Sequence, residues 1–149
     1  MITPACQPTT LTPNEDSSVP HLTIEYSANV AEHHDLDPLL DTIHSTVLET
    51  GIGPVAGLRI RAIEQRHYRI ADGDPSFAFI AMYARLGPGR DLATRQAFIE
   101  TVLDAGEAAL HDSPLHIAWS MEVAEIDPAV RVNRNGIAPV LAARTGSDD

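Results

Sequence analysis

The sequence predicts an α+β domain in which two tandem β-α-β units form one four-stranded sheet with two helices on one face. Strand and helix patterns alternate as β-α-β and then again as β-α-β, in two halves of similar length. A length of 149 residues suits one domain. Parallel strands joined by right-handed crossovers would place both helices on the same side of the sheet. The opposite face would then be bare and apolar, and we expect a homo-oligomer to cover it.

The first unit begins abruptly at Pro20. Residues 21–27 alternate apolar and polar side chains, which predicts a strand. Asp37 is the expected N-cap of the following helix and Pro38 its first residue, while Gly51 is expected to end it. The apolar residues at helical spacing are Leu36, Leu39, Leu40, Ile43, Val47 and Leu48.

The second strand lies within residues 57–70 and the third covers 76–86, with a turn over 71–75 between them. In the second strand, alternation places Leu58, Ile60 and Ala62 on one face and Arg59, Arg61 and Ile63 on the other. The third strand is apolar almost throughout, so we expect it to be buried on both faces.

The second unit continues with a Gly/Pro turn, a helix and a fourth strand. Asp91 is the expected cap of this helix, Pro114 closes the helical region, and residues 115–126 form the strand. These elements define a domain over residues 20–140. Residues 1–19, rich in Pro, Thr and Ser, are expected to be a disordered extension, and residues 141–149 a flexible tail.

The charge of the chain argues against several classes of function. Its 21 acidic and 10 basic residues give a net charge of −11, which disfavours nucleic acids and anionic membranes as partners. All the basic residues are arginine, so a lysine Schiff base is excluded. No apolar run is long enough to span a membrane, and Cys6 is the only cysteine. We therefore expect a cytoplasmic protein.

Few patterns indicate a cofactor or a metal. His33 and His34 are adjacent on an expected loop, where they rarely bind one ion, and residues 87–89 lack the Lys and Ser/Thr of a phosphate loop. Two arginines are the better candidates. Arg59 lies between apolar residues of a strand, and Arg90 lies at a strand-to-helix junction where a helix N-terminus also favours anions. Taken alone, either arginine is better explained by a salt bridge to one of the many carboxylates.

Four segments in register resemble the 5-carboxymethyl-2-hydroxymuconate Δ-isomerase family of the tautomerase superfamily, which also contains 4-oxalocrotonate tautomerase and macrophage migration inhibitory factor. They are PHLTIEYSANV at 20–30, TGIGPVAGLRIR at 50–61, ADG at 71–73 and the LGPGR stretch ending at Arg90. The resemblance covers residues 20–138 and implies a duplicated β-α-β fold assembled as a homotrimer.

The resemblance also implies an activity and its residues. The family isomerises a dienol formed in aromatic catabolism, with an N-terminal proline as base. Carried to this chain, Pro20 is the base, and Arg59 and Arg90 bind and polarise a polycarboxylate substrate. No cofactor and no metal are implied.

This chain departs from the family pattern because 19 residues precede Pro20. An internal proline nitrogen is an amide and cannot accept a proton. Three explanations are open: translation that starts at the Val19 codon read as GUG, removal of the extension by a protease, or loss of activity. The third would make the chain an inactive trimeric carboxylate-binding homologue.

Overall fold

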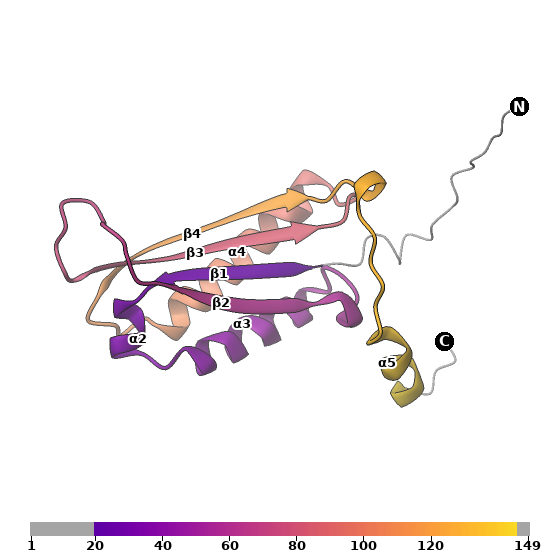
Figure 1. Ribbon diagram of the computed structural model, residues 1–149, viewed down its shortest axis with the longest axis horizontal. Coiled ribbons are helices and arrows are strands. Elements are labelled where there is room, and N and C mark those ends of the chain that lie inside the picture. The colour runs from indigo at the N-terminus through magenta and orange to yellow at the C-terminus, as the bar shows by residue number, and fades with distance from the viewer. Residues whose placement is uncertain (1–19, 146–149) are drawn as a thin grey trace, which may run out of the picture.

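The structure is a computed structural model and describes residues 20–145 (Figure 1). The predictions for 1–19 and 146–149 lie outside the described residues. The elements in chain order are β1 His21–Ser27, α2 Asn29–His33, α3 Leu36–Thr50, the 3₁₀ turn η1 Val55–Gly57, β2 Arg59–Gln65, β3 Phe77–Leu86, α4 Leu92–Ala109, β4 His116–Glu125, the 3₁₀ turn η2 Pro128–Val130 and α5 Ala138–Thr145.

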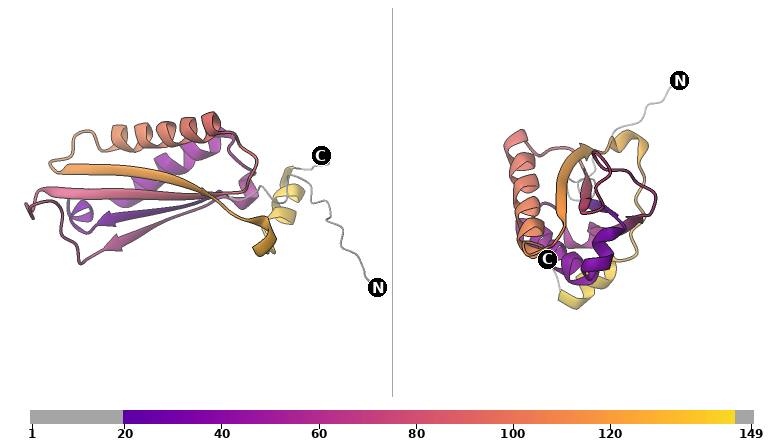
Figure 2. Two further views of the ribbon diagram at one scale, coloured as in Figure 1. Left: turned by 90° about the horizontal axis from the view of Figure 1, so that it is seen from above. Right: turned by 90° about the vertical axis from the view of Figure 1, so that its left-hand side faces the viewer.

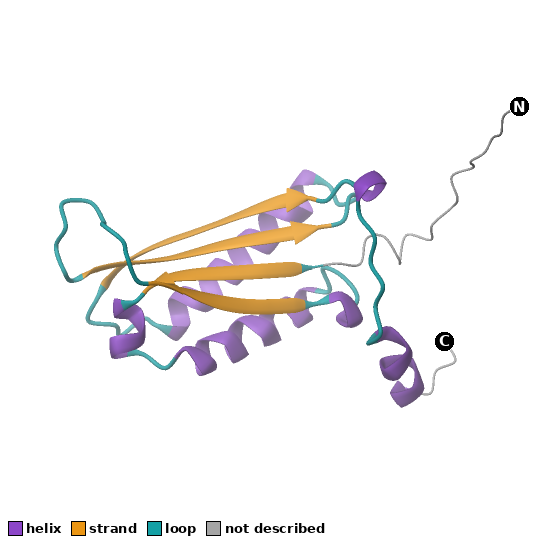
Figure 3. Ribbon diagram, in the orientation of Figure 1, coloured by secondary structure: helices purple, strands orange, loops and turns teal. Residues whose placement is uncertain are grey.

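The four strands form one mixed sheet in the order β2-β1-β3-β4, as expected for two β-α-β units (Figure 3). Within each unit the strands are parallel, and the two units meet through the antiparallel pair β1–β3. In the register, His21 lies opposite Arg59 on one side and Arg85 on the other. The starts of β1 and β2 therefore meet the ends of β3 and β4 at one end of the sheet.

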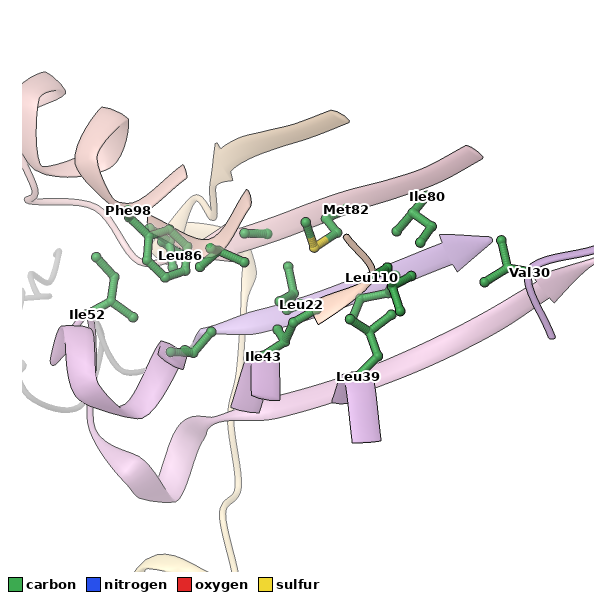
Figure 4. Close-up of a cluster of buried hydrophobic side chains, with 14 of the residues drawn as sticks. Leu22, Val30, Leu39, Ile43, Ile52, Ile80, Met82, Leu86, Phe98 and Leu110 are labelled. Atoms are coloured by element: carbon green, nitrogen blue, oxygen red, sulfur yellow. The ribbon is translucent and has the colours of Figure 1, made fainter. Parts of the chain in front are cut away.

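Both long helices, α3 and α4, cover the same face of the sheet (Figure 2). The core lies between these two layers and is built from alternate strand residues and one stripe of each helix (Figure 4). At one point the layers approach closely: an added Cβ on Gly106 of α4 would lie 2.7 Å from Cζ3 of Trp119 on β4. The fully buried core side chains include Leu22, Ile24, Val30, Ile43, Ile80, Met82, Leu86 and Val102.

The start of α3 differs from the prediction. The N-cap is Asp35, whose carboxylate accepts a hydrogen bond from the Asp37 amide at 3.1 Å. Asp37 was therefore the wrong cap, and Pro38 is the third residue of the helix. Proline is tolerated there because the first four helical N–H groups have no partner within the helix. The predicted end is confirmed, because Gly51 adopts the left-handed conformation with φ +65°.

Two short helices were not predicted. Helix α2 begins directly after β1, so His33 ends a helix rather than lying on a loop. Helix α5 runs over Ala138–Thr145, across the expected boundary at residue 140, and packs beside η1 at the end of the sheet (Figure 1). No helix of the described residues 20–145 is long and apolar enough to cross a membrane.

The sheet face away from the helices is open, as predicted, but it is not apolar. Strand alternation places charged and polar side chains there, together with a smaller apolar group. The polar set includes His21, Thr23, Glu25, Arg59, Arg61, Gln65, Arg85, His116, Ser120 and Glu122, and the apolar set Ile63, Phe77, Phe79, Ala81, Tyr83, Ala118 and Ala124. The prediction that β3 is buried on both faces is therefore wrong for the single chain: only its helix-side residues are buried, and Tyr83 is 39% exposed.

Candidate functional site

All three residues predicted to act in catalysis lie at the same end of the sheet. Pro20 directly precedes β1, Arg59 begins β2, and Arg90 follows β3 by a short turn. This convergence is a consequence of the topology, since the antiparallel β1–β3 pair brings the start of the first unit beside the end of the third strand. The arrangement within that end, however, separates the three side chains into two groups.

Pro20 and Arg90 form the first group, and they meet at Gly53. A Cβ added to Gly53 would lie 3.1 Å from Cδ and 3.3 Å from Cγ of Pro20, and 3.4 Å from Nη2 of Arg90. Pro20 itself is buried. The absence of a side chain at Gly53 is therefore what lets the proline ring and the guanidinium approach the same point. Cδ is bonded to the proline nitrogen, so that nitrogen is also close to this point.

The Arg90 side chain is held by main-chain carbonyl groups. Its Nε donates to the Ile52 carbonyl oxygen at 2.7 Å, its Nη2 donates to the same oxygen, and its Nη1 donates to the Gly87 oxygen at 3.0 Å. Burial lowers the pKa of Arg90, and the nearby Glu125 carboxylate opposes that shift. A guanidinium remains protonated in proteins despite such shifts. Arg90 is thus a fixed positive charge beside Pro20.

The expected contribution of the α4 N-terminus to anion binding is not supported. Asp91 caps the helix, as predicted, and its carboxylate accepts from the Thr94 amide at 2.8 Å. Hydrogen bonds from the side chain and the backbone of Thr94 hold the pKa of Asp91 below its usual value. A carboxylate already occupies the helix N-terminus, so the positive charge at this junction is that of Arg90.

Arg59 belongs to the second group, because its side chain points to the open face of the sheet. Its amide nitrogen donates to the Pro20 carbonyl oxygen at 3.1 Å, as part of the β1–β2 ladder. Its guanidinium, by contrast, lies against His21, with Nη1 2.7 Å from Nε2 of the imidazole and 3.4 Å from the Gly57 carbonyl oxygen. The Arg59 guanidinium is therefore held beside His21 on the open face of the sheet.

His21 is the centre of a basic cluster that was not predicted from the sequence. Burial and then the charges of Arg59, Arg131, Arg61 and Arg85 lower its pKa to about 4. These arginines come from two strands and the segment after β4. Strand pairing was the missing information: once β1 and β3 are known to be neighbours, His21 lies opposite Arg85. Arg131 lies outside any strand, so no pattern in the sequence placed it near His21.

No group of three or more potential metal ligands occurs among residues 20–145. His34 pairs with Ser113, with Nε2 2.7 Å from Oγ, and His111 Nδ1 lies 3.0 Å from the Ala108 carbonyl oxygen at the end of α4. A groove of about 390 Å³ between α3 and α4 includes Ile52, whose carbonyl group holds Arg90.

Comparison with known proteins connects this geometry to a family. Residues 20–141 match the family model described as 5-carboxymethyl-2-hydroxymuconate isomerase. The 5-carboxymethyl-2-hydroxymuconate Delta-isomerase of Escherichia coli is 34% identical over 122 residues, which cover 80% of this chain and 96% of that protein. The chain belongs to the 5-carboxymethyl-2-hydroxymuconate isomerase family. The predicted family is thereby confirmed, and membership places this protein among the isomerases.

Solved structures agree with the family and the fold. A 5-carboxymethyl-2-hydroxymuconate isomerase from Deinococcus radiodurans R1 is 28% identical, with a TM-score of 0.73 over 84% of this chain and 96% of its own. A further Δ-isomerase of the same name has a TM-score of 0.77 at 22% identity, covering 85% and 95% of the two chains. A fused 4-OT solved as a symmetric trimer shares the fold, with a TM-score of 0.53 at 18% identity over 70% and 85%.

Proposed function

We propose that this isomerase ketonises a 2-hydroxydienoate such as 5-carboxymethyl-2-hydroxymuconate in the cytoplasm, with the nitrogen of Pro20 as base in a form that begins at Pro20. The observation that carries the proposal is the meeting of Pro20 and Arg90 at Gly53. The family match begins at the same residue, Pro20, so residues 1–19 lie outside the part shared with the isomerases.

The chemistry needs a base whose pKa is close to the working pH. Ketonisation removes the proton from the 2-hydroxyl group, and a proton is added at a distant carbon of the conjugated system. One amine can accept the first proton and deliver the second. Burial and the neighbouring Arg90 charge both disfavour the protonated amine and would lower the pKa of an N-terminal proline. The nitrogen would then be unprotonated in enough of the enzyme to act.

Arginines suit the substrate in this proposal. A guanidinium binds a carboxylate through two parallel hydrogen bonds and stabilises negative charge that develops on oxygen. The net charge of −11 repels a polyanion at a distance. Screening over about 8–10 Å limits that repulsion, so a local group of arginines can dominate near the site.

We propose further that the protein is a homotrimer and that its site is completed between copies. Arg59 lies on the open sheet face, whereas Pro20 meets Arg90 at the Gly53 loop. A neighbouring copy that covers the open face would receive Arg59 beside its own Pro20–Arg90 pair. Sedimentation at micromolar concentration tests the trimer, and a monomer contradicts it.

Mixed trimers test the sharing of the site. Arg59→Ala and Arg90→Ala are each expected to lower kcat/KM by about 10²-fold or more, because each removes charge-assisted hydrogen bonds. Refolding the two impaired variants together should restore part of the activity, since an intact Arg59 from one copy then meets an intact Arg90 of another. A mixture no more active than the separate variants would place all three residues in one chain.

The decisive experiment compares the full chain with a form that begins at Pro20 after removal of an initiator methionine. In the full chain the Pro20 nitrogen is an amide, so we expect it to be nearly inactive on 2-hydroxydienoates. In the short form the rate should rise with pH as the amine loses its proton, with a midpoint below that of free proline. Equal activity of both forms would exclude Pro20 as the base.

The alternative is an inactive carboxylate-binding homologue, and the 19 residues before Pro20 favour it. If the extension remains in the cell, the arginines bind a carboxylate with no base beside them. Mass spectrometry of the native protein separates the two functions. A mature chain that begins at Pro20 supports the isomerase, and one that retains the extension supports the binding protein.

A further inference from the structure

The contact between His21 and Arg59 has a defined polarity. The guanidinium has only donors, so in the 2.7 Å contact Nη1 donates and Nε2 of the imidazole accepts. An accepting Nε2 carries no proton, and the ring is therefore neutral with its proton on Nδ1. The β1–β2 register fixes this pair, because His21 and Arg59 lie directly opposite each other.

The surroundings of His21 favour the neutral ring. Arg59 and Arg61 face it from β2, Arg85 from β3 and Arg131 from the segment after β4. Together with burial, these charges lower its pKa to about 4, so the ring is unprotonated at neutral pH. A protonated His21 ring would repel the surrounding arginines, and the neutral ring avoids that repulsion.

A neutral acceptor has a consequence that a carboxylate would not have. A carboxylate opposite Arg59 would orient the guanidinium and also cancel most of its charge. We propose that His21 is a positioning residue that orients the Arg59 guanidinium without neutralising it, so that the full charge is available to a substrate carboxylate. The inference rests on the proposed function, in which Arg59 binds that carboxylate.

Three variants of the form that begins at Pro20 test the role. His21→Gln keeps a neutral acceptor near the position of Nε2, His21→Leu removes the acceptor, and His21→Glu supplies a charged one. We expect Leu to raise KM roughly ten-fold with a much smaller change in kcat, since the hydrogen bond that orients a charged group is lost. Gln should stay within about three-fold of the parent, and Glu should raise KM at least as much as Leu.

Two kinetic results would overturn the proposal. A Leu variant with the KM of the parent would mean that Arg59 needs no orienting partner. A Glu variant as active as Gln would mean that keeping the charge of Arg59 has no effect. A purely structural contact would instead lower stability in the Leu variant and leave its KM unchanged.

Unfolding in urea as a function of pH gives a readout that does not depend on activity. The folded pKa of about 4 lies below the unfolded value of 6.5. The stability from the neutral ring is therefore complete above pH 6.5 and is lost as the pH falls toward 4. His21→Gln should lack this loss, and parallel curves for the two proteins would contradict the neutral histidine. If the parent is inactive but the curves differ, the proposed function fails while the neutral contact stands.

Discussion

Replacing Gly53 with alanine tests whether the approach of Pro20 to Arg90 matters. The new Cβ would lie 3.1 Å from Cδ of Pro20, whereas an ordinary contact begins near 3.4 Å, so the ring must withdraw by about 0.3 Å. A displacement of about 1 Å in a site can lower the rate ~100-fold. If the logarithm of the rate loss is proportional to the displacement, a shift of about 0.3 Å lowers the rate about 4-fold. We therefore expect kcat/KM of the form beginning at Pro20 to fall by about that factor.

The same substitution has a stability consequence. Overpacking typically costs about 1–3 kcal/mol, and the stiffer unfolded chain returns about 0.4–1 kcal/mol. Gly136→Ala is the matched control, because its Cβ would meet no atom within 4 Å and its φ is not in the left-handed region. It should be neutral or slightly stabilising in urea unfolding and should leave the rate unchanged. If the two variants agree in rate and unfolding midpoint, the steric argument for Gly53 is wrong.

Three further contacts in the fold can each be tested by one substitution. Gly106→Ala should destabilise the fold in urea unfolding, because the new Cβ would lie 2.7 Å from Trp119 and such overpacking costs about 1–3 kcal/mol. The higher helix propensity of alanine offsets about 1 kcal/mol of that cost. Adding Trp119→Phe should reduce the loss. Asp91→Ala should lower Tm at neutral pH through loss of the bond from Thr94, and the difference should vanish as the pH falls through the lowered pKa of Asp91. Arg90→Lys should lower kcat/KM and also the unfolding midpoint, because an ammonium cannot reproduce three donors in one plane.

The layer arrangement was predictable because each signal was local. Alternation over residues 21–27 gave β1, and the αL glycine at Gly51 ended α3 where expected. The short helices were not predictable in the same way, since the five residues of α2 are too few to show a helical period. The cap of α3 was misplaced by two residues because Asp35 and Asp37 are both acceptable caps, and only the 3.1 Å bond distinguishes them.

The sequence named Pro20, Arg59 and Arg90 as candidates, but it could not tell which of them the fold brings together. The alternation in β2 placed Arg59 on the face of the sheet opposite to that of Ile60. The approach of Pro20 to Arg90 depends instead on the loop that contains Gly53, and no sequence pattern predicts that geometry. The open face was expected to be bare and apolar. The pairing of β1 with β3 instead gathers His21 and Arg85 there with Arg59.

The duplication of the β-α-β unit has a consequence for where a catalytic amine can occur. Pro20 precedes the first strand of one unit, and Ser76 precedes the first strand of the other, at the opposite end of the sheet. A polypeptide has one amino terminus, so joining two units leaves only one of these equivalent positions able to carry a free amine. Circular permutation that opens the loop before Ser76 would move the terminus to the far end and convert the nitrogen of Pro20 into a permanent amide. In the proposed mechanism the two units, although similar in shape, therefore have different roles: the first supplies the reactive nitrogen, and the second supplies the charge of Arg90 beside it.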